Sequence, residues 1–113
     1  MPLLPSLKQK KRYVVFEIQA EESFSLQEAE AAVKEGLLRF LGEFGVAKAG
    51  PMFIREKYQP NKFILKINNK YVAEVISAII LIKSIKNKAV ILRSIITSGT
   101  LKKANGYVEK RGV

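Results

Sequence analysis

The chain has 113 residues, 48% of them hydrophobic, and a formal net charge of +10, which together predict one small domain with a single core. It contains no cysteine, histidine or aspartate, so disulfides, thiolate nucleophiles, imidazole bases and cysteine or histidine zinc sites are excluded. All ten acidic residues are glutamate and form no obvious cluster beyond Glu21–Glu22, so we expect neither a catalytic centre nor a cofactor bound by the protein itself.

The chain is expected to begin with a basic, irregular arm, residues 1–11, because Pro2 and Pro5 disfavour regular structure and lysines follow them. Hydrophobicity then alternates over residues 12–20, which predicts the first strand. One face of this strand should point to the core through Val14, Phe16 and Ile18.

A helix is predicted next, because Ser25 and Glu28 have the spacing of a capping box. Gly42 and Gly45 predict its C-terminal end. Its exposed side should be acidic, since residues 13–45 hold seven of the ten glutamates. The core face is expected to present hydrophobic residues at helical spacing, namely Val33, Leu37, Phe40, Leu41 and Phe44.

The rest of the chain predicts a further helix and three more strands. Asn68 or Asn69 would cap this helix, which should run to about Ile85 and be followed by a loop at residues 86–88. After Gly99 we expect a basic C-terminal tail, residues 99–113, with room for one short helix. The three strands are expected at Val46–Tyr58, Lys62–Asn68 and Ala89–Thr97.

This order of elements, β-α-β-β-α-β, is typical of an α+β, ferredoxin-like sandwich of the kind found in RNA-recognition domains. Such a domain has a four-stranded antiparallel sheet with both helices on one face, and its crossovers have the favoured right hand. We assign residues 12–98 to this domain, between the basic arm and the basic tail.

Charge is segregated along the chain. Residues 1–12 contribute +4, residues 13–45 contribute −5, residues 46–74 contribute +4 and residues 75–113 contribute +7. A basic surface opposite an acidic one suits a nucleic acid, whereas a lysine-rich surface that only maintains solubility is the alternative. The prevalence of lysine, glutamate and isoleucine is typical of hyperthermophile proteins.

The sheet face away from the helices does not have the pattern that reads single-stranded RNA. The strand at residues 62–68 lacks the aromatic residues on which bases stack, because its one aromatic residue, Phe63, should point to the core. Sequence-specific base stacking is therefore disfavoured. The expected residues of this outer face are Tyr13, Val15, Glu17, Ile64, Lys66 and Arg93, with Arg55 as a further candidate.

Four apolar residues are candidates for a protein–protein interface. Val15 and Ile64 belong to the outer sheet face. On the second helix, Ile80 lies at the border of the apolar stripe and Leu81 lies outside it. Each of them is compatible with an ordinary surface position, but together they suggest that another protein chain covers them.

Two basic segments flank the first and the last strand, which are neighbours in the predicted sheet. They should converge in space and contact RNA phosphates without reading bases; two separately solvated termini are the alternative. The turn at Ser98–Thr100 either binds a phosphate through its amides or only ends the strand. The candidate RNA contacts are Lys10, Lys11, Arg12, Arg93, Lys102 and Lys103.

Four segments, in order along the chain, resemble the pattern of a known family, protein component 2 of ribonuclease P, which archaeal ribonuclease P shares with the eukaryotic ribonuclease P and MRP complexes. The resemblance extends over almost the whole chain, and the length favours the archaeal branch. The most specific of the segments is the last one. The four are Lys11–Glu17, Ala47–Gly50, Lys70–Val75 and Ser98–Ala104.

The resemblance implies a ferredoxin-like fold and a role in removing the 5′ leader from precursor tRNA. In this family the RNA subunit performs the hydrolysis with bound Mg²⁺, and the protein supports it without a catalytic site of its own. The implied partners are the ribonuclease P RNA, precursor tRNA indirectly, and protein component 3, with two copies of component 2 in a heterotetramer. We expect a cytoplasmic protein with no membrane partner, because no apolar run approaches the roughly 20 residues that span a bilayer.

Two other classes of function stay open from the sequence. One is a stand-alone ferredoxin-like enzyme or small-molecule sensor, against which the lack of His, Cys and Asp argues. The other is a general ribosomal or RNA-chaperone protein, which composition alone does not separate from a ribonuclease P subunit.

Overall fold

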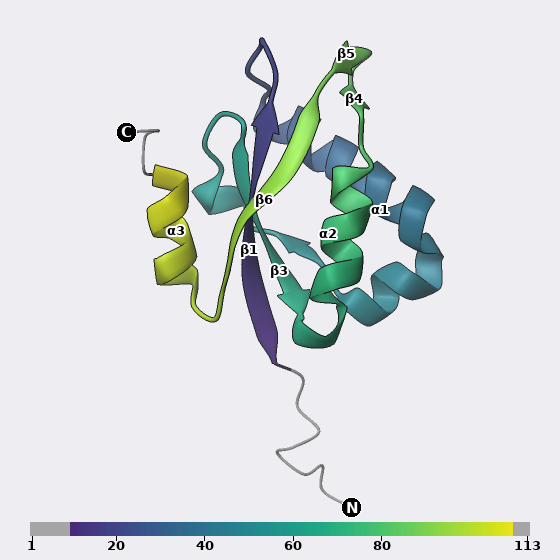
Figure 1. Cartoon of the computed structure of the whole chain (residues 1–113), viewed down its shortest axis with the longest axis vertical. Coiled ribbons are helices and arrows are strands. Elements are labelled where there is room, and N and C mark those ends of the chain that lie inside the picture. Colours follow the sequence, from purple (N-terminus) through teal and green to yellow (C-terminus); the bar gives the residue numbers. More distant parts are fainter. Residues whose placement is uncertain (1–9, 110–113) are drawn as a thin grey trace, which may run out of the picture.

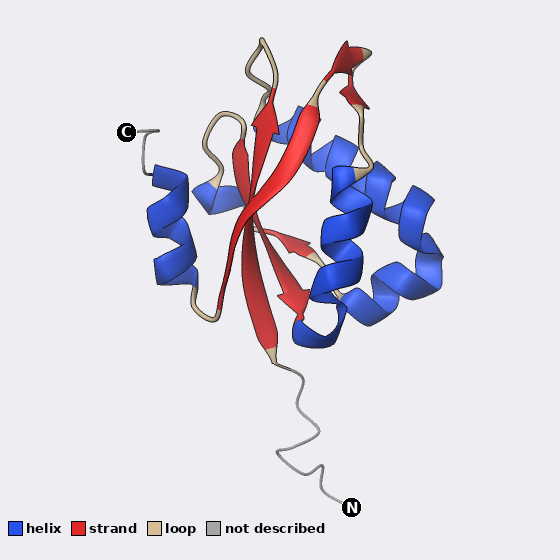
Figure 2. Cartoon of the chain, in the orientation of Figure 1, coloured by secondary structure: helices blue, strands red, loops and turns tan. Residues whose placement is uncertain are grey.

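The computed structural model describes residues 10–109 of the chain (Figures 1 and 2). Its main strands are β1 (Lys11–Gln19), β2 (Met52–Phe53), β3 (Lys62–Asn68) and β6 (Ile91–Ser98). A small hairpin, β4 (Ser84–Ile85) and β5 (Lys88–Ala89), precedes β6. The helices are α1 (Leu26–Ala49), α2 (Val72–Ile80) and α3 (Leu101–Glu109), with single 3₁₀ turns at Arg55–Lys57 and Asn69–Tyr71.

The main sheet has the strand order β2-β3-β1-β6, and all of its neighbours are antiparallel. Helices α1 and α2 cover one face, as Figure 1 shows. This confirms the α+β, ferredoxin-like prediction. The expected alternation along β1 is also confirmed, because Val14, Phe16 and Ile18 are buried under the two helices, where the Phe16 and Phe63 rings stack with centroids 5.3 Å apart.

Helix α1 begins as predicted but ends later. The Ser25 hydroxyl accepts a hydrogen bond from the Glu28 amide, and the Glu28 carboxylate accepts one from the Ser25 amide. Gly42, predicted as a stop, instead adopts φ 74° and ψ 172°, which kinks the helix and lets it resume as far as Ala49. Gly50 then ends it in the left-handed conformation.

The kink corrects two predictions. The second strand was expected at Val46–Tyr58, but only Met52–Phe53 pairs with β3, because α1 occupies the first part of that segment. Phe40 and Phe44 were expected in the core and are 38% and 85% exposed. The non-helical turn at Gly42 interrupts the helical spacing before Phe44, whereas Phe40 precedes the kink and lines the open groove between α1 and α2.

Helix α2 is shorter than predicted, and the segment that follows it forms a hairpin. The side chain of Asn68 caps no helix; its amide donates to the carbonyl of Lys48 at the C-terminal end of α1. Lys86 and Asn87, expected in a loop, have positive φ values of 54° and 65° and form the tight turn between β4 and β5.

The outer face of the sheet is partly covered by a third helix, which the strand–helix order did not include. Helix α3 comes from the segment predicted as a basic tail, and it packs against β1, β3 and β6 through Ala104 and Val108, which are four residues apart on one side of the helix. Val15 and Ile64 are consequently 0% exposed. Figure 2 shows the resulting three layers, with α3 opposite α1 and α2.

A partly buried ion pair joins α1 to the connection between β2 and β3. Arg55, considered above for the outer face, donates from Nε and Nη2 to Glu30 Oε1, each at 2.9 Å. The Glu30 side chain is 11% exposed. The hydrogen bonds from Arg55 hold the pKa of the Glu30 carboxyl below its usual value of 4.5.

This pair predicts a pH dependence of stability. A carboxyl whose pKa is lowered by folding stabilises the protein above its unfolded pKa, and this contribution is lost as the pH falls through the folded pKa. The free energy of unfolding should therefore differ most between the wild type and Glu30→Gln above about pH 5. The difference should shrink below pH 4.5, as measured by urea unfolding. A difference that stays constant from about pH 3 to 7 would contradict this assignment.

Candidate nucleic-acid interface

The start of β1 lies beside the end of β6. Tyr13 pairs with Ser98 in the antiparallel register, so Arg12 comes next to Gly99. A Cβ atom on Gly99 would lie only 3.2 Å from Nη1 of Arg12, which shows how closely the guanidinium approaches the turn. The first residues of β1 therefore lie beside the turn that follows β6, as the predicted order of the strands requires.

The turn between β6 and α3 is held by side-chain hydrogen bonds. The buried Ser98 hydroxyl accepts from the Thr100 amide at 3.2 Å and donates to the Thr100 carbonyl at 3.1 Å. The Thr100 hydroxyl accepts from the Lys103 amide at 3.3 Å and so caps α3. The turn therefore ends β6 and caps α3, and it uses the Thr100 amide within the chain.

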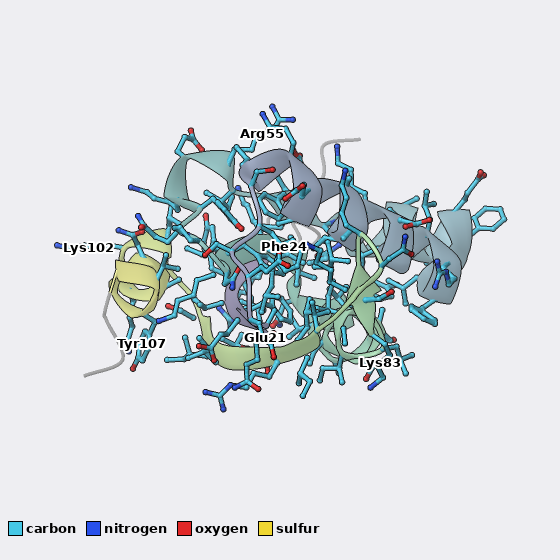
Figure 3. The ribbon with its side chains drawn as sticks, turned by 90° about the horizontal axis from the view of Figure 1, so that it is seen from above. Glu21, Phe24, Arg55, Lys83, Lys102 and Tyr107 are labelled. Atoms are coloured by element: carbon cyan, nitrogen blue, oxygen red, sulfur yellow. The ribbon has the colours of Figure 1, made fainter. Side chains whose placement is uncertain are left out.

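Lys102 and Lys103 are exposed in the first turn of α3. Figure 3 shows Lys102 projecting away from the body of the protein. Neither lysine, nor Arg12, forms an ion pair with a carboxylate in the part of the chain that the structure describes. Cations at a helix N-terminus repel the helix dipole, so this arrangement concentrates positive potential that an anion would relieve. We call Arg12, Ser98–Thr100, Lys102 and Lys103 the basic corner.

The other predicted contacts lie elsewhere. Lys10 is exposed just before β1, and its carbonyl accepts from the Asn69 amide. The Lys11 ammonium lies near Gly50 at the C-terminal end of α1. A Cβ atom built on Gly50 would be 3.5 Å from Nζ of Lys11. A cation is favoured at that end of a helix. Residues 1–9 and 110–113, including the remaining basic residues of the arm and tail, lie outside the described part of the chain.

Arg93 is also separate from the basic corner. Its Nε donates to Glu17 Oε1 at 2.9 Å, so its charge is partnered within the sheet. Ser98 is five residues further along β6, or about 17 Å of strand away. A related contact that the sequence analysis missed is the Lys66 ammonium over the Tyr13 ring, 5.9 Å from its centroid. The pairing of these two residues across β1 and β3 was the available signal.

A second candidate surface is apolar and belongs to α1 and α2. Ile80 and Leu81 are 40% and 48% exposed, as expected for a partner-covered face. Val15 and Ile64, predicted with them, are covered by α3 of the same chain and are not accessible in this structure. Helix α1 contributes further exposed residues, and a groove of about 320 Å³ runs between the two helices. We call this set the apolar surface; it consists of Leu38, Phe40, Phe44, Ile80 and Leu81.

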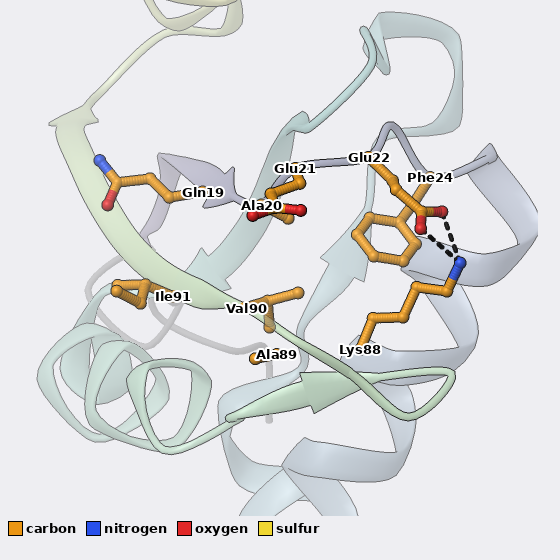
Figure 4. Close-up of a pocket in the computed structure, with 9 residues that line it drawn as sticks. All are labelled: Gln19, Ala20, Glu21, Glu22, Phe24, Lys88, Ala89, Val90 and Ile91. Atoms are coloured by element: carbon orange, nitrogen blue, oxygen red, sulfur yellow. Dashed lines mark hydrogen bonds and ion pairs between the residues drawn. The ribbon is translucent and has the colours of Figure 1, made fainter.

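A cavity of about 510 Å³ lies at the opposite end of β1 from the basic corner (Figure 4). Its walls include Phe24, Val90 and Ile91, and its polar rim includes the ion pair between Glu22 and Lys88. Within residues 10–109, no three acidic residues lie close enough to hold a metal ion, and no helix is long and apolar enough to cross a membrane.

A model of the Rpp14/Pop5 family matches residues 12–109. The chain is 35% identical over 101 residues to ribonuclease P protein component 2 of Pyrococcus abyssi, covering 89% of this chain and 86% of the relative. Its identity is 31% to the protein of the same name in Methanocaldococcus jannaschii, over 90% of this chain and 75% of the relative.

The fold is similar to that of a chain in the cryo-EM structure of yeast ribonuclease MRP. The TM-score is 0.67, and the match covers 90% of this chain and 88% of the yeast chain. Since only 11% of the aligned residues are identical, this likeness establishes the fold alone.

The cap at Thr100 predicts a stability effect. Thr100→Val removes the hydroxyl that accepts from the Lys103 amide, and loss of such a cap typically costs about 1 kcal/mol. Urea unfolding should show this loss, whereas Thr100→Ser, which keeps a hydroxyl, should unfold close to the wild type. Equal stability of the valine and serine variants would show that the hydroxyl does not cap α3.

Proposed function

The chain belongs to the Rpp14/Pop5 family, and on that premise we propose that it is a non-catalytic protein subunit of an archaeal ribonuclease P in the cytoplasm. In this role it supports the RNA that removes the 5′ leader from precursor tRNA. The RNA would use Mg²⁺ for the hydrolysis, and the protein would bind no cofactor. The observation that supports this most is the basic corner: Arg12 lies beside the turn at Gly99, the exposed Lys102 and Lys103 follow that turn in sequence, and none of the three has an acidic partner in the described chain.

The proposed mechanism is electrostatic. Arg12, Lys102 and Lys103 would each neutralise a phosphate of the folded RNA and release its counterions. Close packing of RNA helices brings phosphates together, and Mg²⁺ otherwise has to offset their repulsion. A protein that supplies fixed positive charge at such a place lowers the Mg²⁺ concentration at which the RNA holds its active fold. The protein would then raise the rate of cleavage without touching the reacting phosphodiester.

The covered outer face of the sheet supports contact with the RNA backbone instead of base reading. Val15 and Ile64, where an RNA-recognition domain would stack bases, lie under α3. The exposed groups of the basic corner are lysine ammonium and arginine guanidinium groups, which bind phosphates of any sequence. We therefore infer that the shape of the RNA, more than its sequence, sets where this protein binds.

The apolar surface supports a role within a larger assembly. Phe40 and Leu81 line the groove between α1 and α2. With Ile80 beside Leu81 and Phe44 85% exposed on α1, these helices expose an unusually large hydrophobic area for a free surface. We propose that protein partners cover it: component 3 of ribonuclease P and a second copy of this chain, together a heterotetramer. This surface is remote from the basic corner, so both can be occupied at once.

Reconstituted cleavage tests the function. Ribonuclease P RNA with component 3 should cleave precursor tRNA poorly at limiting Mg²⁺, and addition of this chain should restore cleavage. The double variant Lys102→Gln, Lys103→Gln should restore it less, and extra Mg²⁺ should close the gap. The control Lys34→Gln, Lys57→Gln has the same net charge and alters two lysines outside the basic corner, so it should behave as the wild type. No gain in cleavage from the wild-type chain would overturn the proposal.

Assembly tests the apolar surface. Leu81→Glu places a charge at a half-exposed position, so the monomer should fold while the complex with component 3 loses mass in light scattering. Ile91→Glu is the matched control, because Ile91 is 63% exposed on β6, outside the apolar surface. A complex of unchanged mass with Leu81→Glu would reject this surface as the protein interface.

A further inference from the structure

The hairpin β4–β5 carries three lysines within six residues, Lys83, Lys86 and Lys88. Lys88 is neutralised by Glu22 from the β1–α1 connection. Lys83 and Lys86 are exposed and form no ion pair in the described part of the chain. The proposed basic corner therefore does not account for all of the unpaired positive charge on the protein.

The segment that carries Lys83 and Lys86 is anchored in the core. Ile85 and Val90 are 3% and 4% exposed and anchor the hairpin in the core on either side of its turn. The Val90 amide also donates to the Lys83 carbonyl at 3.0 Å. With its base fixed in this way, the hairpin holds its lysines at a defined place, which lowers the entropy lost on binding.

The hairpin and α1 enclose a cleft of about 350 Å³. Gly36 permits the close approach that forms its floor, since a Cβ there would lie 2.5 Å from Cδ1 of Ile82. The cleft is rimmed by the cations Arg39, Lys83 and Lys86. Its one carboxylate, Glu35, lies 3.7 Å from the Arg39 guanidinium, so the rim keeps an excess of positive charge.

This cleft is far from the basic corner. The hairpin leads directly into the start of β6, and the basic corner follows the other end of β6, at Ser98. Eight residues of strand span about 25 Å. Figure 3 shows Lys83 and Lys102 on different sides of the protein. One or two nucleotides held at one place could not reach the other.

We propose that the cleft between α1 and the hairpin is a second phosphate-binding site, which takes the backbone of a structured RNA at a stretch distinct from the one at the basic corner. This inference rests on the proposed role in RNA binding and extends it: the protein bridges two segments of the same folded RNA. Bridging would restrain their relative position, which a protein with one site does not do. The excess of positive charge and the size of the cleft favour a phosphate backbone as the occupant.

Binding and footprinting of the full chain on ribonuclease P RNA test the bridge. The variants are Lys83→Gln, Lys86→Gln for the cleft and Lys102→Gln, Lys103→Gln for the corner, with Lys34→Gln, Lys57→Gln as control. Each site variant should reduce the slope of log affinity against log salt by about one to two units. Their effects should add in the quadruple variant, because the sites are far apart. The altered lysines of both sites are exposed and form no ion pair in the described chain, so their variants should melt close to the wild type; in the control, Lys57 is half-buried and Lys34 pairs with Glu30 at 3.5 Å, so its melting temperature is measured beside theirs.

Hydroxyl-radical footprinting separates the two sites. The cleft variant should lose protection of one RNA segment and keep the segment that the corner variant loses. The inference is overturned if the cleft variant binds with the salt slope of the control, or if both variants lose the same nucleotides. It is also overturned if polyglutamate competes as well as RNA for the cleft, since an acidic protein is then the occupant. Failure of the proposed function is distinct, because the wild type itself would then add nothing to reconstituted cleavage.

Discussion

The antiparallel pairing of β1 with β6 is the constraint on which the basic corner depends. It sets Tyr13 opposite Ser98, so that the beginning of β1 and the end of β6 lie at the same end of the sheet. Segments more than eighty residues apart in sequence thereby form one positive surface. The same pairing carries the other end of β6 away from that corner and toward the hairpin. Central strand β1 thus determines both where positive charge gathers and how far apart the two basic sites lie.

Helix α3 has two roles that follow from one packing contact. Ala104 and Val108 bury the outer sheet face, which removes the platform on which bases stack in related folds. The same contact holds α3 against β1 and β6, so that Lys102 and Lys103 follow directly on the turn at Gly99 that Arg12 approaches. The packing of α3 therefore both covers the sheet and fixes the position of the two lysines. A protein built in this way is suited to the backbone of a folded RNA.

The sequence was sufficient for features that depend on local periodicity. Alternation in β1 and β3, the capping box at Ser25 and the pairing of the first strand with the last were all predicted. The misses have long-range causes. One positive φ at Gly42 redirects Phe44 to solvent, and no sequence rule separates such a kink from a helix end. Arg93 pairs with Glu17, and Lys11 lies near Gly50 at the end of α1, and both arrangements depend on the folded sheet.

The most direct test of the account is photocrosslinking in the assembled ribonucleoprotein, with a photoreactive residue at position 12 or at position 102. If the basic corner is a single RNA-binding surface, both positions should crosslink to the same short segment of the ribonuclease P RNA. A probe at position 34, on the acidic side of α1, should not crosslink to that segment. Crosslinks from positions 12 and 102 to unrelated segments, or to protein alone, would contradict the central claim that these cations hold one stretch of RNA.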